Sequence, residues 1–294
     1  MRHVPRNALT LLRADRRRPA ALLAVAALTL LAGCGGGSGD ETVTRTGGAK
    51  ALVLATTTEL RDSGLLASLV PAFESTSDCT VTVEPHTARE ALALGRSGAA
   101  DVLLVDSPAA ERRFMAAGDG TFRVPVLHDS FLLVGPADDP AGAAKTADAG
   151  AALEAVAAHK APFLSRADGS GVDAAERALW KKAGVTPAKP WYVETHADMK
   201  QTLLRASKKH AYTLSDRTTY LAGEQQLGMR VITQGGDQLE DPYSVIVAKR
   251  AGKRTACAKE FAGWLDQPGT QSIIGSFGVG RYGDPLYFPD APTP

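Results

Sequence analysis

Two short segments contain the residue types that bind an oxyanion. The first is Ala55-Thr56-Thr57-Thr58, where three hydroxyl groups lie between an apolar run and a helical pattern. Hydroxyl groups beside the free N–H groups of a helix N-terminus form a cradle for negative charge. The alternative is a plain helix cap made by one threonine. Because a cap needs only one hydroxyl, three in succession favour a ligand site.

The second segment, residues 165–171, also leads from an apolar run into a helical pattern. Arg166 can donate two parallel hydrogen bonds to an oxyanion. Ser170 and Gly171 add a hydroxyl group and an unobstructed backbone N–H. The alternative is a cap formed by Asp168 or Ser170, with Arg166 on the surface. Opposed across a cleft, the two segments would recognise an anion without a cationic surface.

Common catalytic motifs are missing from the sequence. There is no G-x-S-x-G, no Walker loop and no H-E-x-x-H. His128, Asp129 and Ser130 are neighbours in the chain, so their side chains point apart and do not form a triad. We therefore expect a protein that is not an enzyme, with no catalytic residue and no cofactor.

A cation site is the minority interpretation of the remaining polar side chains. Five of them could converge at a cleft: Glu59, His86, Asp106, His196 and Asp198. Imidazole and carboxylate groups are common metal ligands. Solvated loop residues are the simpler explanation, so the sequence predicts no metal site.

Alternating strands and helices are expected to position the two anion-binding segments. The pattern predicts strands at 51–55, 80–83 and 101–105 and helices at 60–74, 88–95 and 108–117. A long strand at 131–136 leads into a second unit, and a strand at 243–248 could return the chain to the first. Such alternation is typical of open α/β sheets, whose ligands bind where strands end. Two α/β lobes crossed more than once by the chain indicate a clamshell binding protein.

Composition narrows the class of protein. The 294 residues are 44% hydrophobic and 22% charged, which excludes a mostly disordered, collagen-like or polytopic membrane chain. Six arginines and a single acidic residue lie within residues 1–33, so the rest of the chain is mildly acidic. Without a basic stripe, a nucleic-acid partner is not expected.

The N-terminus has the pattern of an export signal. Basic residues at 13–18 precede an apolar run at 20–31, which is too short to remain as a membrane-spanning helix. Leu31-Ala32-Gly33-Cys34 resembles a bacterial lipobox, in which Cys34 becomes the lipidated first residue. The alternative is an ordinary signal peptide with Cys34 incidental. We predict a lipoprotein signal peptide at 1–33, a flexible tether at 34–49 and a lipid anchor at the outer face of the cytoplasmic membrane.

Cys79 and Cys257 are the cysteines that remain after Cys34. Outside the cytosol two thiols can pair. The sequence leaves a disulfide and two separate buried thiols as open alternatives.

Several ordered blocks are shared with a known family. They are Ala55-Thr56-Thr57-Thr58, Asp62-Ser63-Gly64-Leu65-Leu66, Asp101-Val102-Leu103-Leu104-Val105, Phe131-Leu132-Leu133-Val134-Gly135-Pro136, Ala161-Pro162-Phe163-Leu164-Ser165-Arg166, Trp191-Tyr192-Val193-Glu194, Asp216-Arg217 and Asp241-Pro242-Tyr243. Through these blocks the chain resembles, from about residue 50 to 288, the tungstate-binding component of ABC importers. The resemblance implies a periplasmic-binding-protein fold with two hinge crossings, a tetrahedral oxyanion ligand and an ABC permease partner.

With that fold we expect lobe 1 at 50–132 and 243–294, and lobe 2 at 133–242. Each lobe is expected to hold a mixed, mostly parallel sheet flanked by helices. The ligand-binding residues expected from the two segments and the resemblance are Thr56, Thr57, Thr58, Glu59, Arg89, Arg166, Ser170, Gly171 and Val172.

The loops depart from the family pattern. Glu59 occupies the serine position of the family's T-T-T-S, which places a carboxylate beside the anion. In the family's R-G-D-x-S-G-T-H, this chain has Ala167, Val172 and Asp173 at the first glycine, the threonine and the histidine. Arg89 replaces a glycine of a G-T-G stretch. Tungstate is the leading ligand, and the alternative is a surface lipoprotein of the same fold that has lost oxyanion binding and binds or senses another small ligand.

Overall fold

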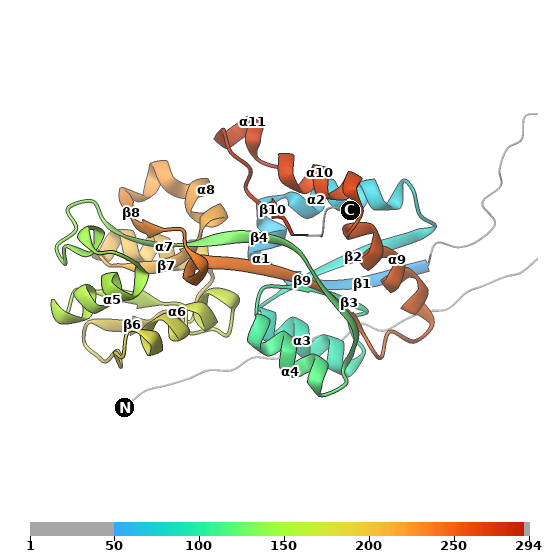
Figure 1. Ribbon diagram of the computed structural model, residues 1–294, viewed down its shortest axis with the longest axis horizontal. Helices are drawn as coiled ribbons and strands as arrows, with labels where there is room; N and C mark the ends of the chain where they lie inside the picture. The colour runs from blue at the N-terminus through green and yellow to red at the C-terminus, as the bar shows by residue number, and fades with distance from the viewer. Residues whose placement is uncertain (1–49, 291–294) are drawn as a thin grey trace, which may run out of the picture. The chain divides into compact units, whose positions relative to one another are not determined.

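The computed structural model describes residues 50–290 (Figure 1). The predicted signal peptide, the tether and Cys34 lie outside the described residues. Within residues 50–290, no helix has both the length and the apolar character needed to cross a bilayer.

The elements alternate along most of the chain. The strands are β1 (Lys50–Thr57), β2 (Cys79–His86), β3 (Val102–Val105), β4 (Gly120–Pro136), β5 (Phe163–Ser165), β6 (Tyr192–Glu194), β7 (Thr213–Asp216), β8 (Met229–Gln234), β9 (Glu240–Ala248) and β10 (Phe288–Pro289). The α-helices are α1 (Thr58–Ser63), α2 (Leu65–Glu74), α3 (Ala88–Ser97), α4 (Pro108–Ala116), α5 (Ala149–Ala158), α6 (Gly171–Lys182), α7 (Met199–Lys209), α8 (Arg217–Leu227), α9 (Thr255–Leu265), α10 (Pro268–Ser276) and α11 (Val279–Tyr282). Short 3₁₀ turns are η1 (Ala143–Lys145), η2 (Asp237–Leu239) and η3 (Gly252–Arg254).

Two strands carry the chain between the lobes, and one of them, β4, pairs with strands of both. One sheet has the order β10-β4-β9-β3-β1-β2, and the last part of β4 pairs with β7 and β8 in the second lobe. Residues 120–130 of β4 pair with β9, and residues 131–136 pair with β7 and β8. Figure 1 shows β4 and β9 running side by side from one group of helices to the other. These strands are the two crossings between the lobes.

The sheets are mixed, as expected, but the prediction that they are mostly parallel is wrong. Among the described residues, β1 pairs in parallel with β2 and β3, and β5 with β6. The pairings β3–β9, β4–β9, β4–β10, β4–β7 and β4–β8 are antiparallel. The reason is the double crossing: β4 leaves lobe 1 and the neighbouring β9 returns to it, so the two must run in opposite directions.

Each lobe has its own hydrophobic core. The core of lobe 2 is built from residues between Phe131 and Leu239, including Phe163, Trp180 and Tyr212. Lobe 1 has two apolar clusters, on the two sides of its sheet, built from residues up to Leu127 and from Tyr243 onward. The apolar side chains of strands and helices therefore pack inside their own lobe. The seam between the lobes is formed instead by polar residues at strand ends.

The predicted helix at 60–74 is two helices. Gly64 lies between α1 and α2 with a φ of 88°, a conformation that favours glycine. Thr57 caps α1, because its hydroxyl accepts a hydrogen bond from the backbone N–H of Leu60 at 3.2 Å. The first turn of this short helix contains Glu59.

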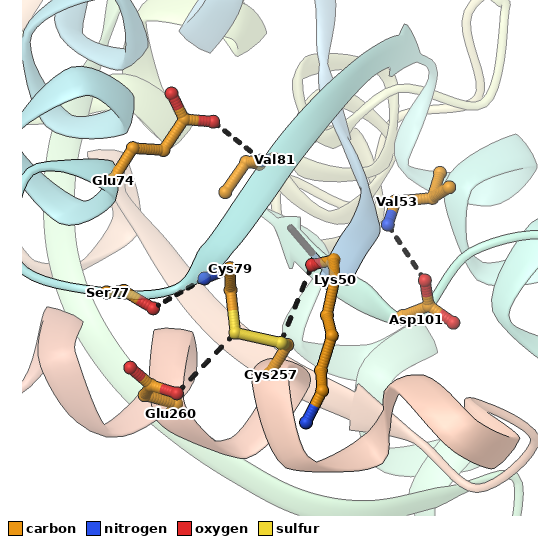
Figure 2. The surroundings of a disulfide bond; sticks show 9 residues. All are labelled: Lys50, Val53, Glu74, Ser77, Cys79, Val81, Asp101, Cys257 and Glu260. Carbon is orange, nitrogen blue, oxygen red and sulfur yellow. Dashed lines mark hydrogen bonds between the residues drawn. A yellow bond between two sulfur atoms is a disulfide. The ribbon is translucent and has the colours of Figure 1, made fainter. Parts of the chain in front are cut away.

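Cys79 and Cys257 are joined by a disulfide (Figure 2). It connects the start of β2 to α9, with 5.8 Å between the two Cα atoms. Glu260 Oε2 lies 3.5 Å from the sulfur of Cys79, and the carbonyl oxygen of Lys50 lies 3.6 Å from that of Cys257. The bond therefore ties together parts of lobe 1 that are 178 residues apart in the sequence.

Reduction of this disulfide is expected to lower the free energy of unfolding by about 2–5 kcal/mol, because the bond restricts a long loop of the unfolded chain. Urea unfolding with and without reductant measures the change. A variant with both Cys79→Ala and Cys257→Ala is the control, because its unfolding should not respond to reductant. An unchanged transition of the wild type on complete reduction contradicts the prediction.

Candidate ligand site between the lobes

The threonine segment is largely built into the scaffold. Thr56 is fully buried, and its hydroxyl donates to the carbonyl oxygen of Leu104 at 2.9 Å. Thr57 caps α1 and shares a second hydrogen bond of 3.3 Å with the hydroxyl of Tyr243. Thr58 begins α1 and lines a groove between the lobes. The capping alternative therefore describes Thr57, and Thr58 is the member of the segment nearest to open space.

Arg166 of lobe 2 reaches across the seam and pairs with Glu59 of lobe 1. Both side chains are buried, with exposed fractions of 3% and 7%. Arg166 also donates to Asp168 Oδ2 from Nε at 3.0 Å and from Nη2 at 2.6 Å. Burial lowers the pKa of the Arg166 guanidinium, but the charges of Glu59 and Asp168 outweigh burial and raise it. A permanently charged guanidinium is thus held between carboxylates from both lobes.

The loop that carries Arg166 is held in shape by hydrogen bonds from its backbone N–H groups to nearby carboxylates. Ala167 and Gly169 have φ values of 50° and 84°. The backbone N–H of Ser170 donates to Asp168 Oδ1 at 3.0 Å, and that of Gly169 donates to Asp173 Oδ2 at 2.9 Å. Ser170 caps α6 by accepting from the N–H of Asp173 at 3.2 Å. These bonds fix the position of Arg166 at the seam.

Gly171 brings the N-terminus of α6 against lobe 1. A Cβ atom at this position would lie 2.2 Å from Asp106 Oδ2, so a side chain at this position would clash with the Asp106 carboxyl group. Negative charge is favoured beside the first turn of a helix. Two lobe 1 carboxyl groups therefore meet lobe 2 at this place: Glu59 pairs with Arg166, and Asp106 lies at the start of α6.

The other expected ligand residues lie around this pair. Arg89, at the start of α3, is exposed and donates to the carbonyl oxygen of Asp168 at 3.1 Å across the seam. Val172 is 2% exposed and belongs to the hydrophobic core of lobe 2. Val172 lies where the family pattern has threonine, and this difference places an apolar side chain in the core of lobe 2. Its recorded packing is with that core.

The five residues of the minority cation interpretation do not come together. His86 lies 3.7 Å from Glu84, and His196, 66% exposed, lies 3.7 Å from Glu194. Asp198 caps α7. Of that set, Glu59 and Asp106 are buried at the seam, and Asp198 lines the groove beside Glu59.

Further acidic residues, which the sequence did not single out as ligands, surround the same place. They are Asp129 on β4, Asp216 at the end of β7 and Asp241 on β9, each 1% exposed. One sequence signal for such residues was available, namely an acidic residue directly after an apolar run. Asp216 follows Thr213-Leu214-Ser215 in this way, and Asp106 follows β3. Only folding shows that these strand ends share one seam.

Burial and mutual repulsion change the titration of these groups. Burial, together with the charges of Glu59 and Glu111, raises the pKa of Asp106 to about 8. Burial and the charge of Asp216 raise the pKa of Asp129 to about 7. Burial and the charge of Glu59 raise the pKa of Asp216 to about 6. Each of these groups binds its proton more tightly in the folded than in the unfolded chain.

The free energy of unfolding is therefore expected to fall as the pH rises from about 5 to about 8, because the folded state holds more protons than the unfolded state in this range. The slope is about 1.4 kcal/mol per pH unit for each extra proton held. Urea unfolding of ligand-free protein across this range measures it. Asp106→Asn should flatten the profile, and a wild type whose stability rises through this range contradicts the prediction.

A groove of about 520 Å³ opens beside Glu59. It is bounded by α1 of lobe 1 and by α7 and α8 of lobe 2, and its lining includes Thr58, Glu59 and Thr218. The Glu59–Arg166 pair is thus next to a space through which a small solute can approach. The arrangement is chemically suited to exchange of one anionic group on Arg166 for another.

Comparison with known proteins identifies the family of this chain. A profile described as a PBP superfamily domain matches residues 43–267. The tungstate-binding protein TupA of Peptoclostridium acidaminophilum is 39% identical over 267 residues, which cover 89% of this chain and 93% of that protein. The chain belongs to the TupA family within the PBP superfamily.

Solved structures of the TupA family agree with the two-lobed architecture. The tungstate ABC transporter structure from Geobacter sulfurreducens is 36% identical with a TM-score of 0.71, and the match covers 77% of this chain and 98% of that one. The tungstate-binding protein TupA of Desulfovibrio alaskensis G20 is 34% identical with a TM-score of 0.71, covering 83% and 100%. The prediction of a two-lobed periplasmic-binding-protein fold is confirmed.

Proposed function

We propose that this protein is an exported solute receptor that binds a tetrahedral oxyanion of the tungstate class and delivers it to an ABC permease. The observation that carries the proposal is the buried ion pair at the seam, in which the guanidinium of Arg166 pairs with a carboxylate from the opposite lobe. The 39% identity to a tungstate-binding protein supports the choice of anion. These relatives are named as binding proteins, which favours a role without catalysis.

The Glu59–Arg166 pair suggests how the ligand enters. The Glu59 carboxylate neutralises Arg166 in the way that a solute's negative charge would. Because the pair joins both lobes, an incoming oxyanion must replace Glu59 on the guanidinium or bind beside it. A ligand that bridges Arg166 and Thr58 favours the closed form, since only closure brings both residues onto it.

Calorimetric titration of the wild type with sodium tungstate tests this function. We expect saturable binding of tungstate and of molybdate. Sodium chloride at matched ionic strength is the control for non-specific charge effects. If no tetrahedral oxyanion binds, the proposal fails and the alternative of a surface lipoprotein with another small ligand replaces it.

The lipid anchor is part of the same proposal. Cys34→Ala is expected to release the protein from membranes, because the lipidated residue is lost. Fractionation of cells into soluble and membrane material measures this, with Ser38→Ala, a substitution in the tether, as the control. Unchanged membrane association of Cys34→Ala contradicts the anchor without affecting the proposed ligand.

A further inference from the structure

Three successive carbonyl groups of the loop that carries Arg166 each accept a hydrogen bond. The backbone N–H of His196 donates to the carbonyl oxygen of Arg166 at 2.9 Å, and its ring nitrogen Nδ1 donates to that of Ala167 at 3.0 Å. Both of these bonds lie within lobe 2. The third carbonyl oxygen, of Asp168, accepts instead from Nη2 of Arg89 in lobe 1 at 3.1 Å. The opposite lobe therefore holds this part of the loop.

The guanidinium of Arg89 also packs on the backbone of this loop. Gly169 has a φ of 84°, and a Cβ atom at this position would lie 2.8 Å from Cζ of Arg89 and 2.9 Å from its Nε. A side chain here would push the guanidinium away, so the close approach depends on glycine. Arg89 thus makes both a hydrogen bond and a van der Waals contact across the seam.

The start of α3 is fixed beside the threonine segment. The hydroxyl of Thr87 accepts from the backbone N–H of Glu90 at 3.3 Å, and the Glu90 carboxylate accepts from the N–H of Thr87 at 3.1 Å. This capping box follows β2 directly, and His86, the last residue of β2, is opposite Thr57 of β1. Arg89 is therefore placed where strands of lobe 1 end, which is the edge that binds ligands in open α/β sheets.

The loop makes two bonds across the seam, and they differ in their relation to the ligand. Arg166 pairs with Glu59, and an oxyanion that binds the guanidinium must compete with this carboxylate. The bond from Arg89 ends on a backbone carbonyl, so it occupies none of the guanidinium donors of Arg166. Another bond between the lobes, from Arg217 to the carbonyl oxygen of Pro285 at 3.0 Å, does not involve the loop. The Arg89 bond can therefore persist while the partner of Arg166 is exchanged.

We propose that Arg89 is a positioning residue of the anion site, which holds the loop of Arg166 against lobe 1 while an oxyanion replaces Glu59. This inference rests on the proposed oxyanion function and deepens it. The Arg89 bond is equally available with Glu59 or the anion on Arg166, and a contact of equal strength in two states does not shift the equilibrium between them. It is lost when the lobes separate. Arg89 therefore slows both entry and release of the anion and leaves its affinity nearly unchanged.

Release rate and affinity, measured together, test this role. Arg89→Ala removes the bond at an exposed helical position and keeps the capping box of α3, so the fold should be retained. We expect radiolabelled tungstate, chased with unlabelled tungstate, to be released about two- to tenfold faster, which is the factor for loss of one hydrogen bond. The Kd from calorimetry should change by less than about twofold, because free and bound forms lose the same contact. The association rate, obtained from these two quantities, should rise with the release rate.

Arg96→Ala is the matched control. Arg96 lies on the same helix, is 57% exposed and pairs with Asp119 inside lobe 1 at 2.9 Å, so its loss should change neither rate. Arg89→Lys keeps a donor for the carbonyl oxygen but lacks the planar guanidinium that packs on Gly169, so its release rate should lie between those of wild type and alanine. A weaker affinity of Arg89→Ala with an unchanged association rate would make Arg89 a direct ligand contact and overturn the proposal.

Hydrogen exchange without any added oxyanion distinguishes failure of this inference from failure of the proposed function. The backbone N–H groups of Gly169 and Ser170 are hydrogen-bonded to carboxylates of lobe 2. They should exchange about two- to tenfold faster in Arg89→Ala than in the wild type or in Arg96→Ala, because the loop loses its support from lobe 1. If tungstate does not bind, the receptor function fails while this comparison still holds. Unchanged exchange at both groups overturns the role of Arg89 whether or not tungstate binds.

Discussion

Arg166→Ala is expected to lower the free energy of unfolding by about 3–5 kcal/mol, because it leaves Glu59 and Asp168 buried without their counter-charge. The same substitution should weaken oxyanion binding by about 1.5–3 kcal/mol, roughly tenfold to more than a hundredfold, since a charged hydrogen-bond donor is lost. Urea unfolding measures the first effect and calorimetric titration with tungstate the second.

Arg177→Ala is a matched control for this experiment. Arg177 is 61% exposed and pairs with Asp173 at 2.7 Å, so its loss should change stability by about 1 kcal/mol or less. Arg166→Lys keeps the charge but cannot donate the same forked hydrogen bonds, so it should fall between wild type and alanine. If Arg166→Ala and Arg177→Ala unfold alike, the buried pair is not a major element of stability.

Glu59→Ser should have the opposite effect on oxyanion binding. It removes the carboxylate that occupies Arg166 and restores the hydroxyl at this position of the T-T-T-S pattern. Two unit charges about 4 Å apart interact by about 4 kcal/mol at an effective dielectric constant of 20. Since tenfold corresponds to about 1.4 kcal/mol, we expect affinity for tungstate to rise by roughly a hundredfold or more.

The controls separate a local from a general effect of charge. Asp62→Asn removes a negative charge from the same helix, α1, at an exposed position, and should change the affinity little. Glu59→Gln removes the charge while keeping the length of the side chain, so it should share most of the gain. Weaker tungstate binding by Glu59→Ser than by the wild type would mean that Glu59 assists the anion instead of competing with it.

Local patterns were enough to predict many of the elements. The predicted helix at 88–95 begins where α3 begins, and the predicted strand at 51–55 lies within β1. The patterns were less informative where tertiary contacts override them. β4 begins eleven residues before the predicted strand at 131, because its early part alternates between faces and is stabilised by pairing with β9.

For the candidate site, the sequence identified Arg166 and Glu59 but predicted for each a role beside a ligand. Their direct pairing depends on the contact between lobes, which no local pattern encodes. Thr56 and Val172, both expected to bind the ligand, also make contacts that local patterns did not predict. The hydroxyl of Thr56 donates to a strand carbonyl, and the side chain of Val172 packs in a core. The sequence did not indicate that Asp129, Asp216 and Asp241 belong together.

By itself the sequence determined the fold class, the family resemblance and the two segments that meet at the seam, because these depend on periodicity and ordered motifs. Only the tertiary structure decided that the cleft is rich in buried acid. Strand order and register place β3, β4, β7 and β9 so that their ends converge, and residues far apart in the chain then share one desolvated space. Charge in such a space depends on neighbours brought by folding, so composition alone, with nearly equal numbers of acids and bases, gave no sign of it.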